Sequence, residues 1–208
     1  MKYRLTNKTI LWNGHFLHRI QATKDFGDVC KGDLGGFVED EKNLSHEGNA
    51  WVYGDAKVYG NARVYGDARV YGEAQVYGLA RVYGDARVYD QAWVSGNAKV
   101  HGDAKVWDNA WVYCNAEVCG NATVYDKAWV GDNAQVYGDA EVYGNTWVCD
   151  NAKVYNNAKV FGNSKVYGNA QVFDEAEVCG EAEAYGNAWI YGNARVDGNA
   201  GVCGDVHR

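Results

Sequence analysis

Residues 60–71 read Gly-Asn-Ala-Arg-Val-Tyr-Gly-Asp-Ala-Arg-Val-Tyr, two copies of a six-residue unit that decides the fold of this chain. The unit repeats from Gly48 to Cys203 as 26 consecutive hexads, with no inserted or deleted residue. Ala occupies the third position in 24 hexads, Val occupies the fifth in 24, and Gly opens 18 of them. A fixed short period of this kind is typical of a solenoid, in which each unit stacks on similar units.

The alternation of residue types within a hexad predicts a short strand followed by a tight bend. Ala and Val lie two residues apart and point to one face of a strand, whereas the fourth and sixth residues point to the other. Val suits a buried, pleated position, and Gly followed by Asn or Asp tolerates the left-handed backbone angles of a turn. Because every unit is alike, the chain must coil in one direction around an Ala/Val core.

A longer period, equal to three hexads, is superimposed on the hexads. One series at the second position is a nearly pure Asn ladder: Asn61, Leu79, Asn97, Asn115, Asn133, Asn151, Asn169 and Asn187. Another series, at the fourth position, contains Trp93, Trp111, Trp129 and Trp147. Residues stacked in successive coils share their chemistry, so each coil should contain three hexads and the prism should be triangular. About nine coils at the ~4.8 Å spacing of paired strands predict a length of roughly 42 Å.

Residues 1–47 lack the repeat and are expected to cap the solenoid of residues 48–208. Asn13-Gly14 lies between two apolar segments, residues 10–12 and 16–17, and is a strong signal for a β-hairpin. Residues 34–38 then lead into an irregular first coil. A solenoid needs such a cap because its first strands would otherwise expose unpaired backbone groups.

The hexad pattern resembles that of left-handed parallel β-helices, in which an aliphatic and a small residue recur every six positions. The resemblance covers 156 of the 208 residues. It implies an all-β fold, a single-stranded, left-handed, triangular parallel β-helix with an N-terminal cap. The cap segments Asp25-Phe26-Gly27-Asp28-Val29 and Gly35-Gly36-Phe37-Val38, followed by Glu47-Gly48-Asn49-Ala50-Trp51-Val52-Tyr53, are similar to those of YdcK-type β-helix proteins of bacteria and their phages. That family brings no activity that can be assigned to particular residues.

Many left-handed β-helices are acyltransferases, and this resemblance supplies the strongest enzyme hypothesis. Those enzymes carry an extended loop with a catalytic His and bind substrate between trimer subunits, whereas these hexads contain no inserted loop. His101 lies within a regular coil, where its outward position favours a ladder substitution over a general base. We therefore expect no catalytic residue and no cofactor. An acyltransferase-like enzyme with a site between subunits is the alternative.

The six cysteines are expected to be reduced thiols, because a bridge along a column needs two cysteines that are three hexads apart and no pair has this separation. Reduced thiols favour a cytoplasmic protein.

Two stacks contain residues of metal-binding type. His101 lies one coil before Cys119, which offers only two ligands, too few for zinc. Asp67, Asp85 and Asp103 also stack, and each precedes a basic residue by two positions. We expect local ion pairs there and no metal site, with bound Ca²⁺ as the alternative.

The net charge of −7 arises in residues 113–208, which hold six basic and thirteen acidic side chains. This balance argues against binding to a nucleic-acid backbone, and the lack of a long apolar run argues against a membrane span. Five residues form an acidic run with no base among them: Asp174, Glu175, Glu177, Glu181 and Glu183. This candidate acidic patch suits a basic partner, although a solvated face is the commoner explanation.

The outward aromatic residues are the unusual feature of the chain. Tyr fills the sixth position in 15 hexads, and such rings are expected to stack on one another and contribute ~0.2–1 kcal/mol per pair. The series Trp93, Trp111, Trp129 and Trp147 lies on one face only. Ser95 and Gly131 flank it and are expected to leave space beside the indoles. Exposed aromatic patches mark binding surfaces, so these residues are candidates for contact with a protein partner or a second subunit.

These observations together favour a non-enzymatic scaffold or protein-binding module, such as a bacterial or phage accessory protein acting on a host system. Only five residues follow Cys203, too few to cover three strands. We therefore expect a homo-oligomer, a dimer joined through the C-terminal coils rather than a lateral trimer along one aromatic face.

Overall fold

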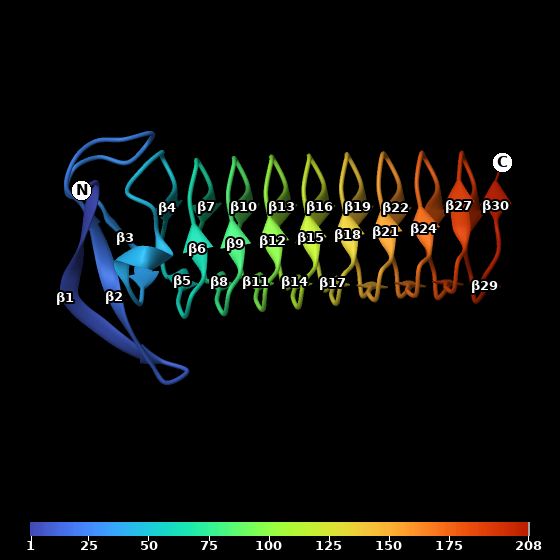
Figure 1. The fold of residues 1–208 in the computed structure, drawn as a ribbon, viewed down its shortest axis with the longest axis horizontal. Coiled ribbons are helices and arrows are strands. Elements are labelled where there is room, and N and C mark those ends of the chain that lie inside the picture. The colour runs from blue at the N-terminus through green and yellow to red at the C-terminus, as the bar shows by residue number, and fades with distance from the viewer. Residues whose placement is uncertain (208) are drawn as a thin grey trace.

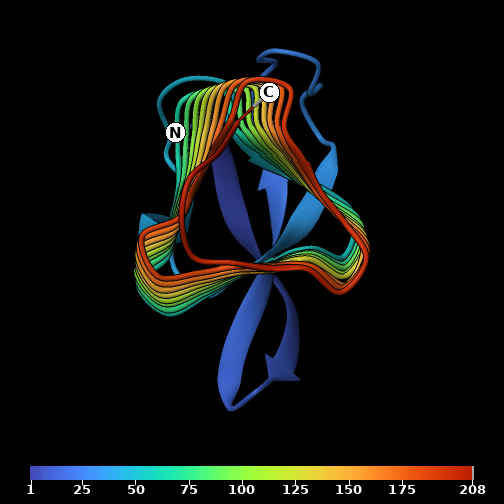
Figure 2. The same ribbon diagram turned by 90° about the vertical axis from the view of Figure 1, so that its right-hand side faces the viewer.

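The computed structural model describes residues 1–207 and shows a parallel β-solenoid of about ten turns with an antiparallel N-terminal part (Figure 1). Seen along its axis, the solenoid is triangular (Figure 2). From β4 to β29, strands three hexads apart pair in parallel, as Val82 does with Val100 and Val100 with Val118. The parallel solenoid is therefore confirmed, whereas the left-handed sense of the coil and the hexad count stay predictions.

Three sheets form the sides of the prism. Sheet 1 consists of β1 (Tyr3–Trp12), β2 (His15–Ala22), β3 (Leu34–Val38), β5 (Lys57–Val58), β8 (Gln75–Val76), β11 (Trp93–Val94), β14 (Trp111–Val112), β17 (Trp129–Val130), β20 (Trp147–Val148), β23 (Lys165–Val166), β26 (Glu183–Ala184) and β29 (Gly201–Val202). Sheet 2 consists of β4 (Trp51–Val52), β7 (Arg69–Val70), β10 (Arg87–Val88), β13 (Lys105–Val106), β16 (Thr123–Val124), β19 (Glu141–Val142), β22 (Lys159–Val160), β25 (Glu177–Val178) and β28 (Arg195–Val196). Sheet 3 consists of β6 (Arg63–Val64), β9 (Arg81–Val82), β12 (Lys99–Val100), β15 (Glu117–Val118), β18 (Gln135–Val136), β21 (Lys153–Val154), β24 (Gln171–Val172), β27 (Trp189–Tyr191) and β30 (Val206–His207).

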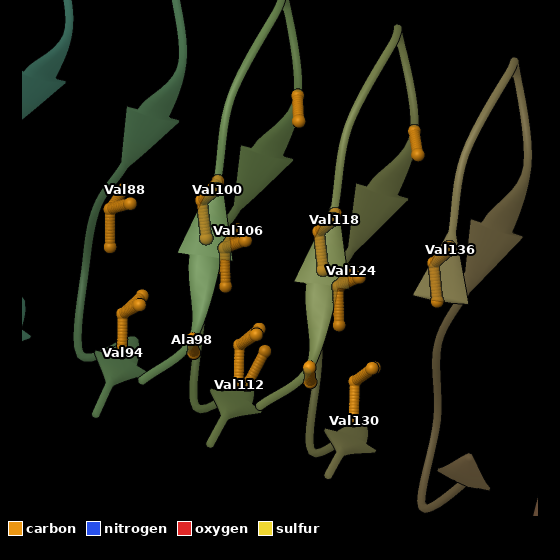
Figure 3. Close-up of a cluster of buried hydrophobic side chains, with 14 of the residues drawn as sticks. Val88, Val94, Ala98, Val100, Val106, Val112, Val118, Val124, Val130 and Val136 are labelled. Atoms are coloured by element: carbon orange, nitrogen blue, oxygen red, sulfur yellow. The ribbon is translucent and has the colours of Figure 1, made fainter. Parts of the chain in front are cut away.

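The core is a column of Val and Ala side chains contributed by all three sheets. Val94, Val100 and Val106 belong to consecutive strands of different sheets, and all point into the prism (Figure 3). Thr146 and Ser164 replace the usual Ala in two hexads and are equally buried. The Ser164 hydroxyl lies 2.9 Å from the Phe161 carbonyl oxygen, whereas the Thr146 hydroxyl has no hydrogen-bond partner among the described residues. The register predicted from the sequence is confirmed.

The corners are built by residues with left-handed backbone angles. Eight hexads lack the opening Gly, and the residue there keeps φ between 53° and 59°. Six of these residues are Asp, whose side chain can also bond to the next coil: Asp150 Oδ2 accepts a hydrogen bond of 2.9 Å from the Gly168 amide. At the following position, the Asn97 amide donates to Asn115 at 2.9 Å, and the ladder continues to Asn187. Polar ladders therefore join the coils along their edges.

The N-terminal part closes one end of the prism. β1 and β2 form the predicted hairpin around Asn13 (φ 48°) and Gly14 (φ 83°). β3 pairs antiparallel with β2 and parallel with β5, which joins the hairpin to sheet 1. The buried Lys2 ammonium donates to the Ala50 carbonyl at 2.6 Å, in the first coil. A single 3₁₀ turn, η1 (Glu41–Asn43), precedes that coil and is capped by Asp40.

No helix in the part of the chain that the structure describes is long and apolar enough to cross a membrane.

Candidate functional site: the tryptophan column

Four indole rings form a continuous stack on the outside of sheet 1. We call them the tryptophan column: Trp93 (β11), Trp111 (β14), Trp129 (β17) and Trp147 (β20). The parallel register places each residue directly beside the next. Ring centroids are 4.6, 4.8 and 5.1 Å apart along the column, and neighbouring planes are within 10° of parallel. The column follows from the period of three hexads, because strand spacing brings identical outward residues into stacking distance.

Stacking determines which parts of the indoles remain available. Both faces of Trp111 and of Trp129 are covered by neighbouring rings, so these residues present their edges to solvent. Trp147, at the C-terminal end of the column, is 46% exposed. None of the four indole N–H groups donates a hydrogen bond to a group within residues 1–207. The column is therefore a strip of ring edges and free donors rather than a series of open ring faces.

The space expected beside Gly131 is filled. A methyl group added at Gly131 would collide with the ring of Tyr113, which packs edge-on against Trp129 at 6.2 Å. Tyr77 makes a similar edge contact of 6.3 Å with Trp93, one coil before the position of Ser95. The prediction of open space at Gly131 was wrong, because the tyrosine of the preceding coil leans over the small residue. Gly131 serves to let Tyr113 support the tryptophan column.

The hairpin marks the N-terminal border of the tryptophan column. The Trp12 indole donates to Gln75 Oε1 at 3.0 Å, and the Lys57 ammonium lies 4.3 Å from the centroid of the Trp12 ring. Lys57 and Gln75 occupy the outward positions that precede Trp93 on sheet 1, and the hairpin buries both of them. The hairpin ends before the strands that carry the column (Figure 1). The tryptophan column thus begins on the strand that follows the last residue covered by the hairpin.

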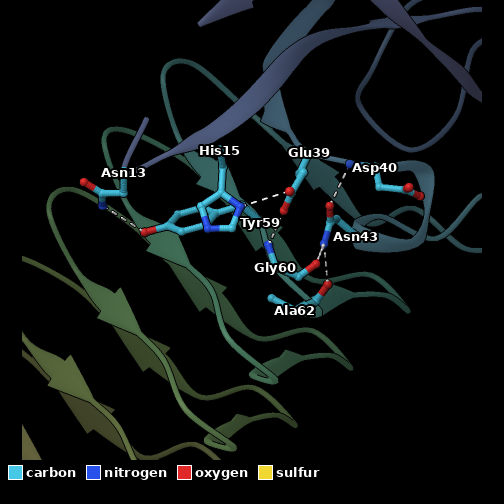
Figure 4. Close-up of polar contacts among 8 residues, drawn as sticks. All are labelled: Asn13, His15, Glu39, Asp40, Asn43, Tyr59, Gly60 and Ala62. Atoms are coloured by element: carbon cyan, nitrogen blue, oxygen red, sulfur yellow. Dashed lines mark hydrogen bonds and ion pairs between the residues drawn. The ribbon is translucent and has the colours of Figure 1, made fainter. Parts of the chain in front are cut away.

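Polar contacts join the turn of the hairpin to the first coils (Figure 4). The Asn13 amide donates to the Tyr59 hydroxyl at 3.3 Å, and His15 Nδ1 lies 2.9 Å from Glu39 Oε1. Glu39 also accepts a hydrogen bond from the Gly60 amide at 2.6 Å. Burial opposes ionisation of Glu39, but the bonds from His15 and Gly60 outweigh it and lower the pKa of this carboxyl. The hairpin is therefore fixed beside the column.

Ion pairs mark the C-terminal border of the column. Lys165 follows Trp147 on sheet 1, and its ammonium lies 2.8 Å from Glu183 Oε1. The Tyr167 hydroxyl donates to the same carboxylate at 3.1 Å. The bond from Lys165, followed by that from Tyr167, lowers the pKa of Glu183. Polar groups therefore bound the tryptophan column at both ends.

The candidate acidic patch does not exist as one surface. Glu177 lies on sheet 2 and pairs with Arg195, whereas Glu183 lies on sheet 1 and pairs with Lys165. Asp174 is a corner residue that accepts hydrogen bonds from Asn156 and Gly192. Glu175 and Glu181 are found at successive corners. Consecutive hexads point to different sides of a triangular prism, which separates residues that are close in sequence.

The stacks of metal-binding type are engaged in other contacts. His101 Nε2 lies 2.9 Å from Glu117 Oε1, and its ring stacks on Tyr83 at 4.6 Å. Asp67 accepts hydrogen bonds from Asn49, and Arg69 pairs instead with Asp28 of the cap at 3.1 Å. The predicted pairs between each Asp and the base two residues later are absent from the described residues. The cap loop, which the repeat did not reveal, supplies the closer carboxylate.

One cluster was missed by sequence reasoning. Asp132, Cys149 and Asp150 offer three ligand atoms within 4.8 Å of one another. Burial, followed by the charges of Asp150 and Asp132, raises the pKa of the Cys149 thiol to about 11, so the thiol is protonated at neutral pH. Both carboxylates also accept hydrogen bonds from the backbone amides of the next coil. The two Asp residues are one coil apart in the sequence, and this spacing was the available signal for the cluster. It indicates that they form hydrogen bonds between the corners of successive coils.

The comparison with known families agrees with this architecture. The family model for the YdcK β-solenoid repeat matches six segments, residues 56–72, 62–78, 80–96, 116–132, 134–150 and 188–204. No curated protein matches the chain. The matched segments lie between the second coil and the last. The chain is a YdcK-type β-solenoid repeat protein.

Proposed function

We propose that this protein is a non-enzymatic scaffold that binds a protein partner along the tryptophan column. The observation that carries the proposal is that the hairpin covers only the first part of the outer face of sheet 1. The hairpin covers the outward residues Lys57 and Gln75, but it does not extend over the four indoles that follow, which are partly exposed. Trp is enriched among residues that dominate binding energies, and a rigid sheet loses little entropy when it binds.

The geometry of the rings favours a protein partner over a stacking ligand. Sugars and nucleobases are held by open ring faces, but the faces of Trp111 and Trp129 are occupied by neighbouring indoles. The column instead offers ring edges and indole N–H donors at intervals of one strand. A protein surface can bury the edges and accept hydrogen bonds from the donors, which is the usual role of Trp at interfaces. A second copy of this chain is one such partner.

The regularity of the coils supports the non-enzymatic assignment. From β4 to β29, strands begin every six residues, and no loop extends over a face to carry a catalytic group. The acyltransferase-like alternative requires a site between subunits. If acetyl-coenzyme A raises the melting temperature of the protein in proportion to its concentration, this alternative gains support.

The experiment that tests the proposal compares matched ladder variants in a capture assay. Tagged wild-type protein, Trp111→Ala/Trp129→Ala and Tyr137→Ala/Tyr155→Ala are used to capture proteins from a bacterial lysate after mild crosslinking. The tyrosine pair stacks at 4.9 Å on sheet 3 and is the control for a lost ring contact. We expect a protein that crosslinks to wild type and to the tyrosine variant but not to the tryptophan variant.

Two outcomes separate the alternatives. If the tryptophan variant changes only the oligomeric state in light scattering, the partner on this face is a second copy of the chain. If the tryptophan variant captures the same proteins as wild type and only its melting temperature falls, the column is structural and the proposal fails. We also propose a cytoplasmic location, which is supported by the six free cysteines.

A further inference from the structure

A cavity of about 550 Å³ lies where the N-terminal cap meets sheet 3. The cap contributes Lys42 and Ser45 to its lining, and sheet 3 contributes Arg63, Tyr65 and Arg81. This cavity is separate from the tryptophan column, which lies on sheet 1.

The two arginines in this cavity form no ion pair with the rest of the described chain. Arg63 and Arg81 lie directly opposite each other on the paired strands β6 and β9, and Lys99 follows them on β12. The Lys99 ammonium lies 4.0 Å from Glu117, but neither arginine forms an ion pair or side-chain hydrogen bond within residues 1–207. Like charges placed directly opposite on adjacent strands are destabilising, so this arrangement favours an external anion.

Sheet 2 carries a similar column in which carboxylates accompany the bases. Arg69 pairs with Asp28 of the cap at 3.1 Å, and Arg87 and Lys105 line one cavity together with Asp85 and Asp103. On sheet 3 the corresponding corner residues are Asn61, Leu79 and Asn97, none of which is charged. On sheet 2 carboxylates therefore lie near the bases, and Arg69 forms an ion pair, whereas on sheet 3 the corner residues beside the bases carry no charge.

The ring of Tyr65 lines the cavity and is stacked on another ring on one face only. Tyr83 stacks on it from the next coil at 4.8 Å. One coil earlier, the Ser45 amide donates to the Val64 carbonyl, just as the Tyr65 amide donates to that of Val82. Ser45 thus occupies the outward place where regular coils often carry a ring, and no aromatic side chain of the described residues stacks on this face of Tyr65. The irregular first coil leaves a planar surface beside the two guanidinium groups.

The charge of the cavity suits a dianion. Lys42, Arg63 and Arg81 contribute positive charge, and Glu41 is the one carboxylate among the lining residues. Glu41 lies on the His46 side of the cavity, 4.0 Å from His46 Nε2. Arginine binds phosphate through two parallel N–H bonds, and guanidinium groups on strands ~4.8 Å apart can share one phosphate.

We propose that this cavity binds a phosphate monoester carrying a planar ring, which is the chemistry of a nucleoside monophosphate. The phosphate contacts Arg63 and Arg81, and the ring stacks on the open face of Tyr65. The inference does not depend on the proposed role of the tryptophan column.

The test is calorimetric titration of the full chain with adenosine monophosphate, inorganic phosphate and adenosine. We expect the monophosphate to bind most tightly and Arg81→Gln to weaken it about tenfold, the equivalent of ~1.4 kcal/mol. Arg87→Gln on sheet 2 is the matched control and should leave binding unchanged. Tyr65→Leu should weaken the monophosphate but not inorganic phosphate, whereas Tyr137→Leu, a ladder change remote from the cavity, should alter neither.

Four outcomes overturn the proposal. If titration with adenosine monophosphate produces no heat of binding, the cavity is not the proposed binding site. Equal affinity for inorganic phosphate removes the role of Tyr65, and equal affinity for adenosine removes that of the arginines. A loss with Arg87→Gln as large as that with Arg81→Gln shows only a general attraction to cations. Melting curves recorded for each variant confirm that the titrated protein is folded.

Discussion

Val136 shows how little freedom a single inward residue of the prism has. Its side chain is completely buried between the valines of the adjacent coils, with which it pairs in register. An aspartate at this place would leave a carboxylate in the core without water or a partner. We expect Val136→Asp to lower the free energy of unfolding by more than about 4 kcal/mol, measured by denaturant titration. Gln135→Asp changes the neighbouring outward residue and should be close to wild type. Equal stability of the two variants would contradict the inward and outward assignment.

Thr146 offers a change in the opposite direction. Its hydroxyl is buried and has no hydrogen-bond partner in the described chain, whereas Ser164, one coil later, bonds to a carbonyl. Thr146→Val keeps the volume and removes the unsatisfied group, so it should stabilise the protein by about 1 kcal/mol. Ser164→Ala should instead destabilise it. Thermal unfolding of both variants tests this, and a lower melting temperature for Thr146→Val would show that the hydroxyl is satisfied in solution.

The tyrosine ladders are elements whose stability should depend on pH. Burial is the main cause that raises the pKa of Tyr89 and Tyr125 to about 12, from 10.0 for a free tyrosine. The folded state therefore holds the phenol proton more tightly than the unfolded state. This stabilisation is complete below pH 10 and is lost as the pH rises through the folded pKa values.

We accordingly expect the melting temperature to be insensitive to pH just below 10 and to fall between pH 10 and 12. Near-ultraviolet absorbance of tyrosinate should rise together with unfolding. Tyrosinate appearing at pH 10 in a fully folded protein would show that the ladders are open to solvent.

The strands were predictable because the residue types within each hexad specify its local structure. Ala and Val specify the inward positions, and the recurrence of Asn and Trp at every third hexad specifies which strands pair. The hairpin was predictable from Asn13-Gly14 alone, since that pair tolerates the backbone angles of a tight turn. Local chemistry and long-range register agree along the whole solenoid.

What the sequence did not reveal are the contacts between dissimilar segments. Trp12 covers Gln75, and Arg69 forms an ion pair with Asp28 rather than with its expected local partner. These contacts depend on the path of the cap over the coils, which no periodic pattern encodes. The tilt of Tyr113 over Gly131 was missed for a similar reason, because the conformation of a side chain depends on the room left by its neighbours.

At the scale of the whole molecule, the coil of three hexads determines which residues share a face. The core is nearly the same in every hexad, so a chain lacking one hexad can still bury its Ala and Val side chains. Each later strand would then move to the adjacent sheet. Deletion of residues 114–119 would keep all four tryptophans but place Trp129 and Trp147 on a different side of the prism from Trp93 and Trp111. Deletion of residues 114–131 removes a complete coil and Trp129, but leaves the other three indoles in one column.

The most direct measurement therefore compares these two deletions in the crosslinking capture assay, with circular dichroism to verify folding. The variant that lacks the complete coil should retain the partner that wild type captures, although it has lost a tryptophan. The variant that lacks the single hexad should fold but lose that partner, although it keeps every tryptophan of the column. Retention of the partner by the single-hexad deletion, or its loss from the folded whole-coil deletion, would contradict the claim that an unbroken tryptophan column forms the binding surface.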